Sequence, residues 1–277
     1  MSPDWLAASR RAAEAIGVML ARSPTTAERV RETGTEGEGG DRTLEIDQAA
    51  EDIVFAELDG LRSAGARFTA ISEERGTVDF GGGGTLVVVD PIDGSLNAKR
   101  GMSHYAVSIA VAEGVTMADV VFGYVYDFGP REEWVAWRGK GARLDGEPLD
   151  TAPRERRTRA GKLELVGVES ADPRWLRQSG EALVEHVHRV RAMGTIASTL
   201  CQVAAARLDG MTTLRRCRAV DAAAAQLIAR EGGAHVAFTA FEQPLGAPLD
   251  LEPRSPVVAA RTAAGLAELA TVATLPP

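Results

Sequence analysis

The most constraining feature of this 277-residue chain is a β-branched apolar run that ends in polar residues, VVVDPIDGSLN at 87–97. The apolar half predicts a buried strand, and that strand ends at Asp90. Asp93 follows three residues later, in the turn that leaves the strand. Carboxylates beside a buried strand cost free energy unless a cation neutralises them. The sequence therefore predicts a cation at this strand end, and we expect a metal ion.

Composition limits the kind of protein that this can be. With 45% hydrophobic residues the chain can bury a substantial core, as one large domain or two smaller ones. Cys201 and Cys217 lack the spacing of a disulfide framework or a zinc site, which predicts a reducing compartment. We expect a cytoplasmic protein, because no segment reaches the roughly 18 apolar residues of a membrane span and the N-terminus lacks a secretory apolar core. The net charge of −8 argues against a nucleic-acid partner.

Helical periodicity marks two segments near the N-terminus. Apolar residues recur on one stripe of residues 4–21 and again over residues 46–61, where Gly65 is expected to end the second helix. Between the helices lies a polar, glycine-rich stretch, TGTEGEGGD at 33–41, which predicts a mobile loop. Asp47 lies on the second helix, away from its apolar stripe.

The rest of the chain predicts one sheet of short strands and one layer of alternating strands and helices. A largely antiparallel sheet, flanked by the two helices, is expected from β-like runs at 67–72, 85–89, 105–112, 120–126 and 133–137. An α/β layer is expected from strands at 163–168, 190–193, 234–238 and 256–260, and from helices at 175–188, 195–208, 221–231 and the C-terminal end. The arginine-rich segment 151–159 is the predicted boundary between subdomains at residues 1–150 and 151–277. We therefore predict a mixed α+β and α/β fold.

The residues around the two aspartates suit a hard divalent cation. Glu73 and Glu74 end the strand FTAISEE, so a second strand also carries carboxylates at its end. Magnesium prefers near-octahedral oxygen ligands, which carboxylates, a turn carbonyl, water and a substrate phosphate supply. Histidines and cysteines are not clustered, which argues against zinc. Gly94 allows a tight turn, and a helix that starts at Ser95 would favour a phosphate at its free amides.

Each of these elements also has a plainer interpretation. Paired glutamates at a strand end are most often solvated charge, and DPIDGS alone is equally an Asx-type turn between strands. Asp47 on its helix is more often a surface residue than a catalytic one. Asp221, in the stretch AVDAAAA, suits the N-cap of an alanine-rich helix, although capping and metal binding are compatible. These elements are more informative together, in the order in which they occur, than any one of them alone.

Five segments occur in succession: EIDQAAED around Asp47, ISEE at 71–74, DPIDGSLN at 90–97, MGTIAS at 193–198 with VAAARLDG, and VDAAAAQLIAREGGA at 220–234. This succession resembles the inositol monophosphatase superfamily over about residues 1–265. The GDRTLEID segment, VYDF at 125–128 and the arginine-rich run before Asp221 resemble most the archaeal-type branch, in which inositol monophosphatase and fructose-1,6-bisphosphatase activities coexist. The resemblance implies a layered α-β-α-β-α sandwich and a homodimer.

The resemblance implies a site for two or three magnesium ions. The implied ligands are Glu73, Asp90, the backbone carbonyl of Ile92, Asp93 and Asp221. One ion would use the first three of these, and a second would use the three aspartates. A third, weaker ion is expected near Glu73, with the loop at 33–41 approaching it. The ions would polarise the phosphoryl oxygens, activate a bound water and stabilise the leaving alkoxide, so that no protein nucleophile is required.

Catalytic and substrate-binding roles are implied in the same way. Ser95 and Asp47 match the hydroxyl and the carboxylate that orient or deprotonate the attacking water, and Glu73 is the third catalytic residue. Serine here replaces the commoner threonine without losing the hydroxyl. The residues implied to bind substrate are Gly94 and Ser95 through their amides, Gly194, Thr195 and Arg218. Lithium inhibition is a further expectation of the resemblance.

Departures from the family pattern leave the substrate open. Animal-type inositol enzymes carry a glutamate shortly before the last metal aspartate, but the stretch MTTLRRCRAV before Asp221 has no carboxylate. Arg215, Arg216 and Arg218 either recognise a second phosphate, which would suit a bisphosphate, or are solvated charges. Two further differences from many relatives lie at Ile196 and Val220.

We predict a magnesium-dependent phosphomonoesterase that acts on a small polyol or sugar phosphate in the manner of an inositol monophosphatase. Fructose-1,6-bisphosphatase activity, alone or in addition, is the alternative. Histidinol-phosphate or nucleotide 3'-phosphate hydrolysis, or a catalytically silent role that binds metal or sugar phosphate, also stays open. A haloacid-dehalogenase-type phosphatase needs D-x-D-x-[TSV] and forms an aspartyl phosphate, whereas Asp90 and Asp93 are three residues apart.

Overall fold

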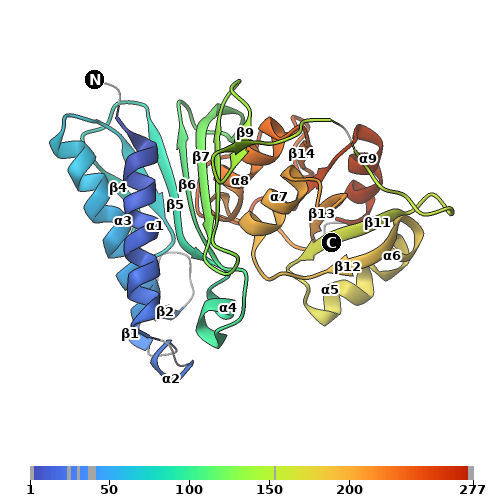
Figure 1. Cartoon of the computed structure of the whole chain (residues 1–277), viewed down its shortest axis with the longest axis horizontal. Helices are drawn as coiled ribbons and strands as arrows, with labels where there is room; N and C mark the ends of the chain where they lie inside the picture. The colour runs from blue at the N-terminus through green and yellow to red at the C-terminus, as the bar shows by residue number, and fades with distance from the viewer. Residues whose placement is uncertain (1–2, 24–25, 30–31, 37–41, 153, 274–277) are drawn as a thin grey trace.

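The computed structural model describes residues 3–23, 26–29, 32–36, 42–152 and 154–273. Two large sheets and the helices around them form five layers, in the order helices, sheet, helices, sheet, helices (Figure 1). This arrangement confirms the predicted α-β-α-β-α sandwich. None of the helices in the described part of the chain has the length and apolar character needed to cross a membrane.

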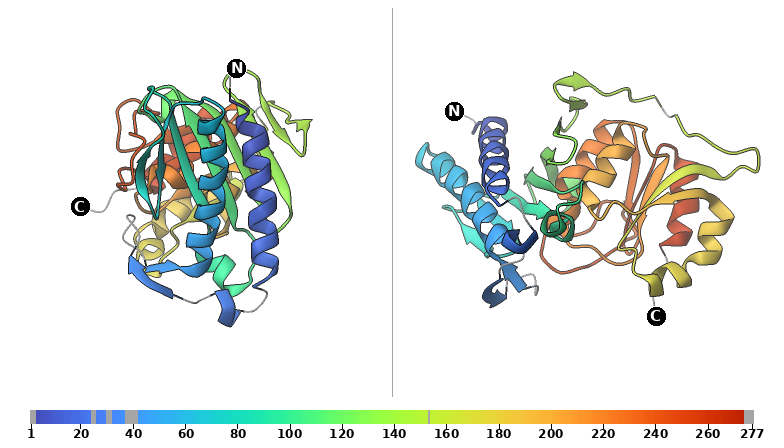
Figure 2. Two further views of the ribbon diagram at one scale, coloured as in Figure 1. Left: turned by 90° about the vertical axis from the view of Figure 1, so that its left-hand side faces the viewer. Right: turned by 60° about the horizontal axis from the view of Figure 1, so that its bottom comes forward.

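Two long helices form the first layer. They are α1, Trp5–Ala21, and α3, Glu45–Ser63, which lie side by side over the first sheet (Figure 2, left). α1 begins after Asp4, whose carboxylate accepts a hydrogen bond from the Ala7 amide at 3.0 Å. Gly65, with a φ of +101°, follows α3 in the left-handed conformation that ends many helices. Both predicted helices are confirmed.

The first sheet is largely antiparallel, as predicted. Its order is β10-β9-β8-β7-β6-β5-β3-β4, and only β3 and β5 are parallel neighbours. The strands are β3 Thr69–Ser72, β4 Gly76–Asp79, β5 Leu86–Asp93, β6 Ala106–Ala112, β7 Val120–Asp127, β8 Glu132–Trp137, β9 Ala142–Leu144 and β10 Glu147–Pro148. The five predicted strands are confirmed, and β5 continues beyond its predicted end to Asp93. The sequence did not predict β4, β9 and β10, which are too short to show a period.

The predicted loop at 33–41 is partly a hairpin. β1, Glu32–Glu36, pairs antiparallel with β2, Arg42–Leu44, so the prediction is wrong for residues 33–36. Strand pairing uses backbone groups, and ETGTE has no apolar alternation that would have revealed it. Residues 37–41 lie outside the described residues. α2, Thr26–Arg29, precedes the hairpin and lies against α4, Ser95–Arg100.

The second sheet has the order β12-β11-β13-β15-β14. Its strands are β11 Leu163–Glu169, β12 Val187–Arg191, β13 Gly210–Thr213, β14 His235–Phe238 and β15 Val257–Ala260. β12, β11 and β13 run parallel, whereas β15 is antiparallel to both of its neighbours. The strand predicted at 190–193 lies at 187–191 instead. β13 was not predicted, because its four residues, GMTT, carry no apolar run although all four are buried.

Two helices fill the space between the sheets, and three lie on the far side (Figure 1). The inner helices are α7 Ile196–Ala204 and α8 Ala219–Glu231, and the outer ones are α5 Pro173–Gln178, α6 Gly180–His186 and α9 Ala263–Val272. A single turn of 3₁₀ helix, η1 Met117–Asp119, precedes β7. The helix predicted at 175–188 is interrupted at Ser179, and the one predicted at 195–208 ends at Ala204. Ala206 has a φ of +54°, which a helix cannot continue through.

Small residues let the inner helices join the two sheets in one core. α8 is buried on nearly all sides, including the alanine run 222–225. At Gly123 in β7, a Cβ would lie 2.5 Å from the carbonyl oxygen of Ala224, so strand and helix touch backbone to backbone. Buried residues of β5 to β8 and of α7 and α8 belong to the same apolar cluster. The division into subdomains at 1–150 and 151–277 stays a prediction.

Candidate active site

The end of β5 carries the two aspartates that the sequence singled out. Asp90 and Asp93 are 3% and 8% exposed, and Ile92 between them is also buried. The pairing of β5 with β6 shifts register between the two aspartates, which marks a bulge. Bulges change the direction of side chains and are common near functional sites. The Ile92 amide donates a hydrogen bond to Oδ1 of Asp90 at 3.0 Å.

Arg218 connects two more acidic residues to this strand end. β3 runs parallel to β5 with Ser72 opposite Val89, so both strands end at the same edge, and Glu73 directly follows β3. The Arg218 guanidinium lies 2.8 Å from Oε1 of Glu73 and 3.6 Å from Oδ1 of Asp221. Asp221 lies in the first turn of α8 and accepts a hydrogen bond from the Arg218 amide at 2.9 Å. Arg218 is the N-cap residue of α8, and the Asp221 carboxylate in the first turn accepts the hydrogen bond from its amide.

Burial and mutual repulsion dominate the electrostatics of this edge. Burial raises the pKa of Asp90 well above its usual range, and Glu73, Asp93 and Asp221 raise it further. Burial, and then the charge of Asp221, raises the pKa of Asp93 to about 8. Burial raises the pKa of Glu73 to about 7, with Arg218 acting against it and Asp221 adding to it. The charge of Asp221 acts on the pKa of Glu73, Asp90 and Asp93 alike, so the four carboxylates lie close together.

The four carboxylates have the ligand chemistry that a hard divalent cation prefers, but they are not prearranged as a complete set of ligands. All four offer only oxygen ligands, which magnesium prefers. Among the residues that the structure describes, no three acidic, histidine or cysteine side chains are arranged to hold a metal ion. Arg218 lies beside Glu73 and Asp221 and acts as their counter-charge. A metal ion held by these carboxylates would take over the role of that guanidinium.

Asp93 is held by the start of α7. The hydroxyl of Thr195 donates to Oδ2 of Asp93 at 2.5 Å, and the Ala197 amide donates to the same oxygen at 2.6 Å. Thr195 is the N-cap of α7, and its hydroxyl also accepts a hydrogen bond from the Ser198 amide at 3.2 Å. Thr195, which the sequence indicated as a substrate-binding residue, therefore holds a candidate metal ligand in place.

Two glycines in the left-handed region pack against each other beside Asp93. Gly94 has a φ of +87° and Gly194 a φ of +82°. A Cβ at Gly94 would lie 3.1 Å from the carbonyl oxygen of Gly194, and a Cβ at Gly194 would lie 2.9 Å from Nδ2 of Asn97. Neither position has room for a side chain. The fold thus brings predicted substrate-binding residues of two distant segments together next to the carboxylates.

A cavity of about 390 Å³ opens beside Asp93 and Asp221. Its lining includes Asn97, Met102 and Glu169, which the sequence analysis did not propose as site residues. Asn97 lies inside the DPIDGSLN segment, and its place there is the signal that could have found it. Glu169 follows the strand predicted at 163–168, and nothing local distinguishes it from a solvated glutamate.

The remaining predicted residues lie on neighbouring elements. Ser95 is half-buried at the start of α4, and Asp47 is half-buried in the first turn of α3. Glu51, one turn after Asp47, is buried and accepts hydrogen bonds from the Ser72 hydroxyl and the Arg75 amide. α3 is thereby tied to the end of β3, next to Glu73. The catalytic roles of Asp47 and Ser95 stay predictions.

Comparison with known proteins shows the class of enzyme to which this fold belongs. That class is the phosphoric monoester hydrolases. The chain belongs to the inositol monophosphatase family, whose model matches residues 3–274. The predicted family is therefore confirmed.

Curated relatives and solved structures agree with the archaeal-type likeness. The fructose-1,6-bisphosphatase/inositol-1-monophosphatase of Thermococcus kodakarensis is 38% identical over 195 residues, 70% of this chain and 68% of that protein. The enzyme of the same name from Archaeoglobus fulgidus is 31% identical over 260 residues, 93% of each chain. A solved inositol monophosphatase–fructose 1,6-bisphosphatase superimposes with a TM-score of 0.79 at 25% identity, over 97% of this chain and 99% of that one. The Nus factor SuhB of Escherichia coli is 32% identical over 231 residues, 80% of each chain.

Proposed function

We propose that this protein is a magnesium-dependent phosphatase that hydrolyses the monoester of a small polyol or sugar phosphate, in the manner of an inositol monophosphatase. One observation supports this most strongly: the pKa values of Glu73, Asp90 and Asp93 are all raised by burial and by the nearby charge of Asp221, and Asp93 and Asp221 line a cavity. A site that gathers so much negative charge is built to hold cations. The cavity of about 390 Å³ has room for a six-carbon substrate.

The proposed roles follow from the position of each residue. Two or three magnesium ions would be held by Glu73, Asp90, the carbonyl of Ile92, Asp93 and Asp221. When bound, the ions supply Lewis-acid polarisation of the phosphoryl group and an activated water. The Ser95 hydroxyl and the Asp47 carboxylate orient that water and accept its proton. The backbone amides of Gly94 and Ser95 hold the phosphate, and Gly194 shapes the opposite wall.

Arg218 has two proposed states. Without a divalent cation its guanidinium neutralises Glu73 and Asp221. If metal ions took over this neutralisation, the guanidinium would bind an anionic group of the substrate, which is the role that the sequence indicated. Arg215 and Arg216 are exposed, and Arg215 lies over the ring of Trp175 at 6.0 Å. Of these three arginines, Arg218 is the one that contacts the carboxylates, and it supports fructose 1,6-bisphosphate as the alternative substrate.

A phosphate-release assay tests the proposed function. The panel consists of inositol 1-phosphate, fructose 1,6-bisphosphate, histidinol phosphate and adenosine 3',5'-bisphosphate, each with and without magnesium. We expect release from one of the first two that depends on magnesium, with no phosphorylated aspartate trapped during turnover. Release from none of the four would contradict the proposal and favour a silent binding role, and release from one of the last two would correct the substrate.

The stability of the metal-free protein is expected to fall as pH rises. Glu73 and Asp93 ordinarily titrate at 4.5 and 3.8, whereas their folded-state pKa values are about 7 and about 8. Between these limits the folded state binds protons that the unfolded state has lost, so the free energy of unfolding decreases from about pH 4 to about pH 8. Magnesium requires deprotonated ligands, so its stabilising effect should grow over the same range.

Thermal unfolding of chelator-treated protein, with and without magnesium, measures this effect. Asp93→Asn removes one of the two titrations and should flatten the pH dependence. A magnesium-induced rise in Tm that is the same at pH 6 and at pH 8 would show that these carboxylates do not bind the ion.

We also expect a cytoplasmic homodimer without a nucleic-acid partner. Cys201 and Cys217 are both buried free thiols, which suits a reducing compartment. The acidic charge of −8 supports a small anionic substrate bound through metal ions rather than a nucleic acid bound through a basic face. Light scattering of the purified protein would test the dimer.

A further inference from the structure

Glu169, at the end of β11, is a buried carboxylate without a role in the proposed chemistry. It is 2% exposed. Its Oε1 accepts hydrogen bonds from the Met193 amide at 2.9 Å and from the Thr199 hydroxyl at 2.7 Å, and its Oε2 accepts one from the Gly194 amide at 2.9 Å. A buried charge is retained only where several donors satisfy it. Here two donors come from the segment that leads into α7, and the third, Thr199, lies within that helix.

That segment is the same one that holds Asp93. Thr195 directly follows the two amides bound by Glu169, and its hydroxyl donates to Asp93 at 2.5 Å. The Ala197 amide, which donates to the same carboxylate oxygen at 2.6 Å, belongs to the first turn of α7. Thr199, bound to Glu169, lies one turn further along the same helix. Glu169 therefore fixes the segment on both sides of the two groups that hold Asp93.

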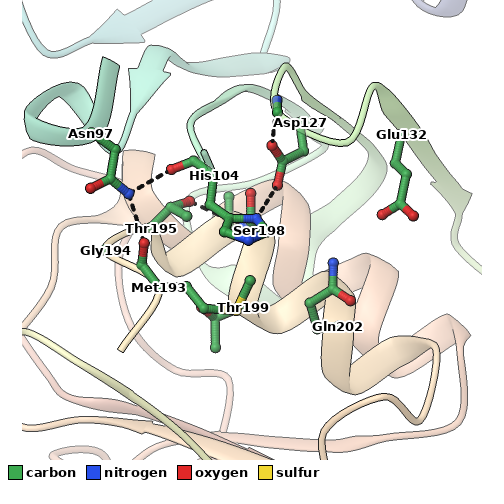
Figure 3. Close-up of polar contacts among 12 residues, drawn as sticks. Asn97, His104, Asp127, Glu132, Met193, Gly194, Thr195, Ser198, Thr199 and Gln202 are labelled. Atoms are coloured by element: carbon green, nitrogen blue, oxygen red, sulfur yellow. Dashed lines mark hydrogen bonds and ion pairs between the residues drawn. The ribbon is translucent and has the colours of Figure 1, made fainter. Parts of the chain in front are cut away.

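Asn97 fixes the opposite side of this segment (Figure 3). Its Nδ2 donates to the carbonyl oxygen of Met193 at 2.7 Å and to that of His104 at 2.8 Å. The segment thus has its amides bound by Glu169 and a carbonyl bound by Asn97. Gly194 is tightly packed against Asn97, since a Cβ at Gly194 would lie 2.9 Å from the same Nδ2. A displacement of the segment would carry Thr195 and the Asp93 carboxylate with it.

We propose that Glu169 is a positioning residue of the phosphatase, which sets the backbone of residues 193–195 so that Thr195 and Ala197 aim the Asp93 carboxylate. The inference depends on the proposed function, because it assigns Asp93 to the metal site. An ionised carboxylate accepts all three hydrogen bonds without an O–H group that would face one of the donors. Glutamine keeps the shape but turns an NH₂ group toward one of the three donors, which leaves that donor unpaired in a buried place.

A double-mutant cycle of Glu169→Gln and Thr195→Val tests this role, with two readouts on each variant. The first is the magnesium dissociation constant of chelator-stripped protein, measured by calorimetry, and the second is kcat and KM in the phosphate-release assay. We expect Glu169→Gln to weaken magnesium binding about tenfold, with a larger loss in kcat than in KM. In the Thr195→Val background the same change should weaken magnesium binding by a smaller factor, because only the Ala197 amide then connects the segment to Asp93.

The controls separate positioning from general destabilisation. Glu164→Gln changes an exposed glutamate on the same strand and should leave magnesium affinity and kcat unchanged. If Glu169→Gln does not fold, Thr199→Val replaces it in the cycle, because it removes one donor of the same carboxylate with nearly the same shape.

Two outcomes would overturn the inference. Unchanged magnesium affinity in folded Glu169→Gln would show that the carboxylate does not act on Asp93. If the losses of magnesium affinity caused by the two substitutions multiply in the double variant, Glu169 acts independently of Thr195. A wild-type protein that binds magnesium but hydrolyses no phosphate ester would instead refute the proposed function, and the binding cycle would still decide the role of Glu169.

Discussion

Asp93→Asn is expected to lose about a thousandfold or more in kcat/KM while the protein stays folded. The asparagine has the same shape, and its carbonyl oxygen can accept both hydrogen bonds, from Thr195 and Ala197, that Oδ2 of Asp93 accepts. What it loses is the negative charge, which a shared metal ion needs. Because burial and Asp221 disfavour that charge in the metal-free protein, Tm should be unchanged or higher at pH 8.

The matched control for this substitution is Asp59→Asn. Asp59 is an exposed aspartate of α3, 3.8 Å from Arg62. It should change neither activity nor Tm measurably, because exposed ion pairs contribute little. A fully active Asp93→Asn enzyme would contradict the assignment of Asp93 to the metal site.

Gly94→Ala is expected to reduce activity by about a hundredfold and to lower stability by about 1–3 kcal/mol. Its φ of +87° disfavours any side chain, and the added Cβ would lie 3.0 Å from the carbonyl oxygen of His104 and 3.1 Å from that of Gly194. Backbone atoms cannot move aside as a flexible side chain can. The turn between Asp93 and Ser95 would open, and the proposed phosphate amides would move with it.

Gly101→Ala separates crowding from backbone strain in this experiment. Gly101 ends α4, the helix that Gly94 begins, and its φ is +65°, but nothing lies within 4 Å of its Cβ position. It should lose stability by a similar strain and keep its activity. Equal activity losses in kinetic assays of the two variants would show that the close contact of Gly94 with Gly194 has no functional role.

The parts of the fold with a strong local pattern could be predicted from the sequence. The apolar stripes of α1 and α3 follow the 3.6-residue period of a helix, and the continuous β-branched run of β5 is typical of a strand buried on both faces. The carboxylates were predictable for the same reason, because Asp90 and Asp93 interrupt a run that is otherwise buried. β4, β9, β10 and β13 could not be predicted, because pairing with distant partners rather than their own pattern makes them strands.

The contacts that organise the site were beyond sequence reasoning. Thr195 and Asp93 are separated by 102 residues, and Asn97 and Met193 by 96. Glu169 looks like any glutamate after a strand until the fold places two amides and a hydroxyl around it. The sequence indicated a substrate-binding role for Arg218, but it did not indicate that the guanidinium lies beside Glu73 and Asp221 in this structure.

Magnesium binding to chelator-stripped protein tests the central claim most directly, which is that carboxylates from β3, β5 and α8 share divalent ions. Isothermal titration of the wild type should show saturable binding of at least two ions per chain. The Asp90→Asn variant should lose most of that binding, because Asp90 is the ligand expected to serve both ions. Absence of saturable binding, or an unchanged isotherm in the folded variant, would contradict the account.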